Sequence, residues 1–93
     1  MAVANELKNS SPKPAVVTFA MTPDVYPLIS SGDIMFTIDQ QPYLQGYLAI
    51  DSIWWYKKNG NILGANLSVP TGPLVIDKSN VAAVQKYSEA GGR

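Results

Sequence analysis

The 93-residue chain contains no cysteine and no histidine, and only 15% of its residues are charged. The lack of cysteine excludes disulfides and thiolate chemistry, and it suits an oxidising compartment. The lack of histidine removes the commonest general base and the commonest metal ligand. The sequence also has no phosphate-binding loop, no metal-ligand spacing and no recognisable pairing among its seven carboxylates. We therefore expect no catalytic residues, no metal site and no cofactor.

Charges of either sign are sparse and evenly spread. Seven basic and seven acidic residues give a formal net charge of zero, without the basic cluster that nucleic-acid binding requires. No apolar run approaches the length of a membrane span, and residues 1–11 lack the charged start and apolar stretch of a signal peptide. The sequence therefore predicts no nucleic-acid partner, and these residues indicate no destination in the cell.

Hydrophobic residues, in contrast, make up 46% of the chain. Globular domains usually carry roughly 25% charged residues, well above the fraction in this chain. A domain of this length also has much surface to solvate relative to its core. We therefore expect part of its surface to be covered, either by other parts of a larger fold or by a partner subunit.

Helical and strand patterns alternate along the chain, which predicts an α/β fold. Helices are expected at residues 2–9, 22–32, 41–58 and 81–89, and strands at residues 15–19, 34–38, 67–69 and 74–76. The first two strands are short apolar runs, typical of a parallel sheet that is covered on both faces. Pro27 is expected either to cost one backbone hydrogen bond or to shift the start of its helix. The fold class is a partial doubly wound parallel sheet.

The helix at residues 41–58 is apolar around most of its circumference. A helix of this kind is usually buried on more than one side. Its Trp54-Trp55-Tyr56 run could form a stacking platform for a ligand, but it lies roughly 15–20 Å from the strand end. Packing against the sheet or a neighbour is the favoured interpretation, and an exposed aromatic here would promote self-association.

The most informative segment is the junction between the second strand and this helix, where Asp39, Gln40 and Gln41 stand together. Ligands of open α/β sheets bind at the carboxyl ends of the strands, so these side chains could contact a small polar molecule. They could equally cap the helix and pair with backbone groups. Taken alone, the residues favour the second interpretation.

Several motifs occur here in one order, and together they resemble a known family. They are Phe19-Ala20-Met21-Thr22-Pro23-Asp24, Gly32 with Ile34-Met35-Phe36-Thr37-Ile38, Asp39-Gln40-Gln41-Pro42-Tyr43-Leu44-Gln45-Gly46-Tyr47, and Thr71-Gly72-Pro73. This order is similar to the C-terminal portion of the type I periplasmic sugar-binding proteins of ABC importers, the group that includes ribose-binding protein. The resemblance covers roughly residues 16–81.

The resemblance implies a ligand site at the ends of the first two strands. It places Gln40 where ribose-binding relatives have a glutamine that bonds sugar hydroxyls, whereas Gln41 and Gln45 are expected to be structural. Those relatives carry an aspartate where this chain has Ala20, followed by Met21. Ala20 has no side-chain acceptor, so the ligand differs or another residue substitutes. Thr18 and Asp39 are the nearby polar candidates.

The resemblance also implies a two-lobed protein that closes on a sugar by hinge motion. Residues 1–93 would be a fragment of its C-terminal lobe, with a possible hinge-crossing segment near residues 66–76. The implied partners are a sugar or sugar-like molecule, the missing remainder of the binding protein and the membrane subunits of an importer in the periplasm. Two other functions stay open: a truncated fold that acts as a homo-oligomerising interaction module, and the sensor domain of a sugar-responsive repressor.

Overall fold

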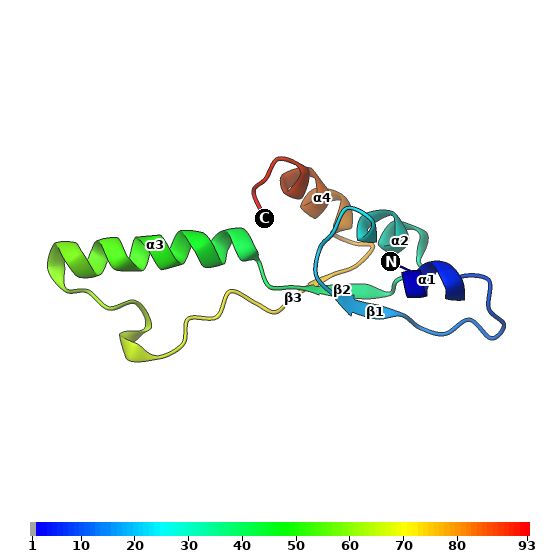
Figure 1. The fold of residues 1–93 in the computed structure, drawn as a ribbon, viewed down its shortest axis with the longest axis horizontal. Helices are drawn as coiled ribbons and strands as arrows, with labels where there is room; N and C mark the ends of the chain where they lie inside the picture. The colour runs from blue at the N-terminus through cyan, green and yellow to red at the C-terminus, as the bar shows by residue number, and fades with distance from the viewer. Residues whose placement is uncertain (1) are drawn as a thin grey trace.

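Three short strands form one sheet in the computed structural model, which describes residues 2–93 (Figure 1). They are β1 (Val17–Phe19), β2 (Phe36–Asp39) and β3 (Leu74–Ile76), arranged in the order β1-β2-β3. β1 and β2 are parallel, whereas β3 is antiparallel to β2. The α/β prediction is therefore confirmed for a mixed sheet that is partly parallel.

The helices are α1 (Ala2–Leu7), α2 (Val25–Ser31), α3 (Pro42–Asn59) and α4 (Val81–Glu89), with a 3₁₀ turn at Leu63–Asn66. Pro27 falls in the first turn of α2, where no intrahelical N–H bond is lost, so the start of the helix has moved past Thr22 as expected. Gly32 ends α2 with a φ of +90°, and its N–H donates to the carbonyls of Leu28 and Ile29. Glycine adopts this left-handed backbone without steric cost.

Within residues 2–93, one face of the sheet is covered, by α2 and α4 (Figure 1). The cross-strand row Thr18, Thr37 and Ile76 lies on this face, and the last two are fully buried. The core consists of Ala4, Val25, Tyr26, Leu28, Ile29, Ile34, Ile76, Val81 and Val84. The neighbouring row on the opposite face is apolar but open, with Phe19 70% and Val75 48% exposed. The prediction that both faces of β1 are covered is therefore wrong for residues 2–93.

Two further sequence predictions are wrong for the part of the chain that the structure describes. Residues 67–69 form no strand, because no neighbouring strand lies beside them to pair with, and Leu67 is 78% exposed. The helix α3 is apolar around its circumference, as predicted, yet none of its residues is buried. It projects from the sheet, and the following segment returns beside it (Figure 1).

The dimensions of the molecule reflect this projection. Its axes measure 59 × 26 × 22 Å and its radius of gyration is 17.2 Å. A compact chain of this length would have a radius of gyration of about 12 Å. Most of the apolar surface of α3 therefore lies outside the core that the sheet forms with α2 and α4.

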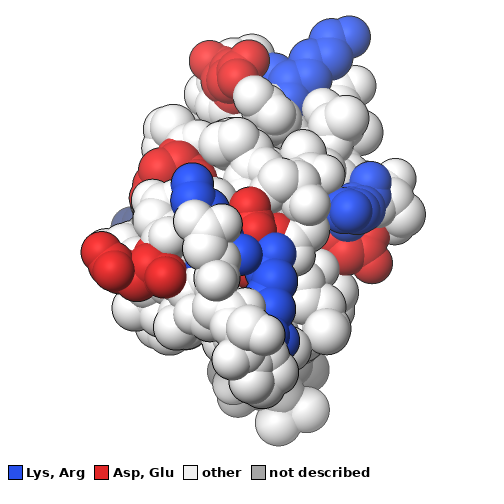
Figure 2. Space-filling model, turned by 90° about the vertical axis from the view of Figure 1, so that its right-hand side faces the viewer, with Lys and Arg blue, Asp and Glu red and all other residues white. Residues whose placement is uncertain are grey.

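Charged side chains form local pairs rather than a patch of one sign. Figure 2 shows acidic and basic groups interspersed on the end of the molecule that it draws. One pair joins the Lys13 ammonium to the Asp33 carboxylate, and hydrogen bonds from Lys13 and Ser31 hold the pKa of Asp33 below its usual value. Within residues 2–93, the search for membrane-spanning helices finds none of the required length and hydropathy.

Because the core covers one face of the sheet, substitutions at Ile76 and Val75, which are neighbours on opposite faces of β3, should differ in their effect on stability. Ile76→Ala should lower the free energy of unfolding by about 2–5 kcal/mol, because it leaves a cavity beneath α2 and α4. Val75→Ala, on the open face, should cost much less, since Val75 is 48% exposed. Urea unfolding of both variants measures the difference, and equal costs would show that the sheet is buried on both sides.

Candidate functional site: a cavity at the strand ends

A cavity of about 370 Å³ lies where β1 and β2 end. It is lined by Phe19, Ala20, Met21, Thr22, Asp39, Gln40, Pro42, Ser88 and Arg93, and we call it the strand-end cavity. All four site residues predicted from the sequence (Ala20, Met21, Asp39 and Gln40) are among them. They meet because the carboxyl ends of two adjacent parallel strands lie at the same edge of the sheet. Thr18, the other polar candidate, does not line this cavity.

The backbone at Ala20 is held in an unusual conformation on one side of the cavity. Its φ is +103°, which residues with a Cβ rarely adopt. The Ala20 N–H donates to the Ile38 carbonyl at 3.1 Å, and the Ala20 carbonyl accepts the buried Thr37 hydroxyl at 2.8 Å. These two bonds hold the strained backbone in place, and strain of this kind often accompanies binding sites.

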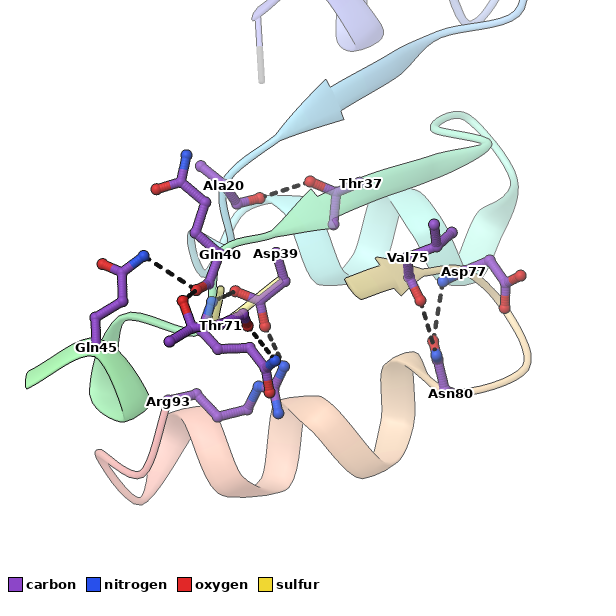
Figure 3. Close-up of polar contacts among 11 residues, drawn as sticks. Ala20, Thr37, Asp39, Gln40, Gln45, Thr71, Val75, Asp77, Asn80 and Arg93 are labelled. Atoms are coloured by element: carbon purple, nitrogen blue, oxygen red, sulfur yellow. Dashed lines mark hydrogen bonds and ion pairs between the residues drawn. The ribbon is translucent and has the colours of Figure 1, made fainter. Parts of the chain in front are cut away.

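Gln40 has a fixed backbone and an unengaged side chain. Its carbonyl accepts hydrogen bonds from the Thr71 hydroxyl at 2.8 Å and from the Gln45 amide at 3.2 Å (Figure 3). The Gln40 amide itself bonds to no other residue within residues 2–93, and the side chain is exposed. The group that the sequence singled out is therefore available to a ligand, whereas the Gln45 side chain is engaged with the backbone of Gln40.

Asp39 differs from Gln40 because its carboxylate is buried and already engaged. The residue is 2% exposed, and its Oδ1 accepts the backbone N–H of Gln41 at 3.0 Å. Its Oδ2 accepts a hydrogen bond from the Arg93 guanidinium, which pairs with it as a salt bridge (Figure 3). With both oxygens committed, Asp39 supports the wall of the cavity in this structure.

Beside the cavity, two passages of the chain are tied together. The chain leaves β2 at Gln40 and Gln41, which we call the strand–helix corner, and it returns to the sheet at Thr71. The Gln41 side-chain amide donates to the Thr71 carbonyl. A Cβ at Gly72 would lie 2.9 Å from the Asp39 carbonyl oxygen, so only glycine permits this approach. The Thr71-Gly72-Pro73 motif thus has a local steric explanation.

A second, more open cavity of about 680 Å³ lies on the other side of the corner. Gln40 lines this cavity too, together with Leu48 and Ser52 of α3 and the returning segment that includes Val69. Ile38 of β2 also lines it. Gln40 therefore stands between two hollows, one formed by the sheet and one formed beside α3.

The aromatic cluster of α3 lies apart from the strand-end cavity. Trp54 and Trp55 meet edge to face with ring centroids 4.6 Å apart, and the Lys58 ammonium lies 4.5 Å from the Trp54 ring centre. Trp54 also lines a shallow groove with Tyr43, Tyr47 and other residues of α3. No other described element buries these rings, so the sheet does not provide the expected packing, and packing against a neighbour stays a prediction.

Sequence reasoning missed two contributors to the cavity, Arg93 and Ser88. Both come from α4 and the segment after it, and Arg93 is separated from Asp39 by 54 positions. No local pattern signals such a contact. Within residues 2–93, no three metal-ligating side chains gather at one place.

The strain at Ala20 makes a prediction about stability. Ala20→Gly should raise the free energy of unfolding by about 1 kcal/mol, because the relieved strain of roughly 1–3 kcal/mol exceeds the entropic cost of glycine. Ala83→Gly, in the exposed face of α4, should instead lower it by about 1 kcal/mol. Thermal unfolding measures whether each variant is more or less stable than the parent chain. A loss of stability in Ala20→Gly would contradict the inference that the backbone at Ala20 is strained.

Comparison with known proteins gives one informative result. No protein-family profile and no curated protein matches the sequence. A solved structure does match, that of a carbohydrate transporter from Acidothermus cellulolyticus 11B in complex with myo-inositol, with a TM-score of 0.80 and 42% sequence identity. The match covers 97% of this chain and 32% of that protein's chain, so the present chain spans about a third of its length.

This match tests the resemblance that residues 19–47 and 71–73 suggested. Identity of 42% over nearly the whole chain goes together with a closely similar fold. The resemblance is therefore confirmed: this chain has the sequence pattern and the α/β fold of one part of a carbohydrate transporter.

Proposed function

We propose that the chain forms part of a solute-binding protein that captures a sugar for an ABC importer. The observation that carries the proposal is the uncommitted Gln40 amide at a cavity that also contains Ala20, Met21 and Asp39. The carbohydrate transporter that matches this fold was solved with myo-inositol bound. That protein is a transporter rather than an enzyme, and we propose a non-catalytic role for this chain as well.

The chemistry of the strand-end cavity suits a neutral polyhydroxylated ring. Each sugar hydroxyl both donates and accepts, and the Gln40 carboxamide does the same. Phe19 and Met21 add apolar surface, which ligand pockets generally need beside a few placed polar groups. Ala20 offers no side-chain acceptor, so hydroxyls on that side require partners from outside this chain.

We propose that the remainder of a binding-protein chain supplies those partners and covers the exposed apolar surface. This chain spans 32% of the matching transporter, so most of that protein lies outside the match. Two apolar surfaces here lack cover within residues 2–93, the open sheet face with Phe19 and Val75 and the whole of α3. One larger fold would cover both surfaces.

Lobe closure is the proposed mode of capture. The chain crosses the edge of the sheet at the strand–helix corner and again within residues 66–76, and the Gln41–Thr71 hydrogen bond ties the crossings together. Paired crossings can act as a hinge while each lobe stays rigid. We propose the membrane subunits of an importer as the downstream partner and the periplasm as the location, because the matching protein is a transporter.

The proposal predicts a measurable role for Gln40. The chimera for this test carries our chain in place of the matching segment of the A. cellulolyticus transporter, and calorimetry measures myo-inositol binding. Gln40→Ala should weaken binding by about 1–3 kcal/mol, because a ligand hydroxyl loses its partner in a desolvated site. The 93-residue chain alone should bind weakly or not at all, since it offers contacts from one side only.

Gln85→Ala is the matched control for this experiment. Gln85 lies on α4, bonds to Glu89 and does not line the cavity, so its loss should leave the dissociation constant unchanged. A Gln40→Ala chimera that binds as tightly as the parent chimera would remove Gln40 from the site. Tight binding of myo-inositol by the isolated chain would contradict the need for a second lobe.

A second candidate, an oligomerising interaction module, is favoured by one observation. None of the residues of α3 is buried, and its side chains include both tryptophans of the chain. Large exposed apolar surfaces commonly mark interaction sites. Under this candidate, the face of α3 would be covered by a second copy of the chain rather than by the rest of a binding protein.

Tryptophan fluorescence separates the two candidates, because both tryptophans report on α3 alone. We expect their emission to be that of solvated indole in the dilute chain and to move to shorter wavelength in the chimera. Self-association would produce the same blue shift in the chain alone as its concentration rises, with a matching increase in sedimentation coefficient. If the emission is identical in the chain and in the chimera, the remainder of the transporter does not cover α3.

A further inference from the structure

Arg93 reaches the strand-end cavity from the segment after α4 and pairs with a buried carboxylate. The side chain of Arg93 is 19% exposed and that of Asp39 is 3% exposed. Figure 3 shows the guanidinium extending from the end of α4 toward Asp39, beneath the strand–helix corner. Arg93 Nε is buried and has no hydrogen-bond partner within residues 2–93, so Asp39 is the group that holds the guanidinium there.

Each charge of the buried Asp39–Arg93 pair depends on the other for compensation. A carboxylate taken out of water needs a cation or several donors, and removing one partner leaves an uncompensated buried charge. Within the described residues, Asp39 receives one backbone N–H, from Gln41, and one cationic partner, Arg93. Without Arg93, the carboxylate would be left buried without a cation, and in moving toward water it would release the Gln41 N–H.

That N–H belongs to the residue that turns the chain from β2 into α3. Gln41 has a φ of +56°, a left-handed conformation that is uncommon for a residue with a side chain. The bond from its N–H to Asp39 Oδ1 at 3.0 Å stabilises this turn. Gln40 lies between Asp39 and Gln41, which this hydrogen bond joins. The direction of the Gln40 side chain therefore depends on the conformation of the turn.

We propose that Arg93 is a positioning residue of the strand-end cavity. By neutralising and anchoring Asp39, it holds the strand–helix corner and keeps the Gln40 amide at the cavity. This inference rests on the proposed function for the role of Gln40 toward a ligand. It does not make Arg93 a ligand contact, because its effect passes through Asp39 and Gln41.

Hydrogen exchange measured by NMR on the 93-residue chain tests the positioning without any ligand. Arg93→Met should accelerate exchange of the Gln41 backbone N–H by about tenfold or more, because its acceptor is no longer anchored. The Ile29 N–H in α2 serves as the control and should stay protected, since its surroundings are unchanged. Arg93→Lys, which keeps the cation, should recover most of the Gln41 protection.

A double-mutant cycle shows whether Arg93 acts through Asp39. Asp39→Asn keeps a carbonyl oxygen for the Gln41 N–H and removes the buried charge. In that background Arg93→Met should change Gln41 exchange by less than about threefold, since coupled residues are non-additive. This comparison also decides the matter if Arg93→Met alone fails to fold. An equal effect of Arg93→Met in both backgrounds would overturn the inference.

Two other outcomes would also overturn it. One is Gln41 exchange that is unchanged in Arg93→Met, and the other is acceleration of Gln41 and Ile29 in step, which reports global loss of stability only. A separate experiment measures the binding of myo-inositol by the chimera. The Arg93→Met chimera should bind about tenfold more weakly and the Arg93→Lys chimera nearly as well as the parent. A parent chimera that never binds, with the exchange result as expected, would overturn the proposed function alone.

Discussion

A contact between two passages of the chain at the edge of the sheet joins the end of β2 to the segment that leads into β3. The Gln41 amide donates to the Thr71 carbonyl, the Thr71 hydroxyl donates to the Gln40 carbonyl, and Gly72 allows the backbones to approach. β3, which pairs with β2, begins just after the returning passage, and α3 begins just after the strand–helix corner. Gln40, which lines the strand-end cavity, is one of the residues joined by this contact.

The parts of the chain on the two sides of this contact differ in how much of their apolar surface is buried. On one side, α2 and α4 cover a sheet face with a real core. On the other side lies the 18-residue helix α3 with no buried residue. Most helical stability in proteins comes from packing an apolar face, and aromatic and β-branched residues add little intrinsic propensity. The hydrophobic excess thus includes surfaces, on α3 and on the open sheet face, that no element within residues 2–93 covers.

Local patterns in the sequence predicted most of the helices and strands, whereas they did not predict contacts between residues that are far apart in the sequence. Gly32 marked the end of α2, and the apolar runs before Ala20 and Asp39 marked the parallel strands. The antiparallel direction of β3 depends on where the chain re-enters the sheet, which no local pattern encodes. Residues 67–69 have a strand-like composition, but no strand within residues 2–93 pairs with them.

The site shows the same division. The junction of strand and helix located Gln40, and the parallel pair β1 and β2 brought it beside Ala20 and Met21. The sequence could not show that Asp39 is buried against Arg93, because that contact spans 54 positions. Nor could it reveal the strained φ at Ala20, which depends on the bonds to Ile38 and Thr37.

The charges at the cavity bear on which ligands it can hold. Asp39 and Arg93 cancel each other, so a charged ligand would have to compete with an existing buried pair. Among the lining side chains, the Gln40 amide and the Ser88 hydroxyl remain without hydrogen bonds within residues 2–93, and both are neutral. Two such groups cannot satisfy a ring that carries several hydroxyls, and each unsatisfied hydroxyl opposes burial. The free polar groups of the cavity are therefore compatible with the neutral polyol that we propose as ligand, and the proposed remainder of a binding protein would have to supply the other hydrogen bonds.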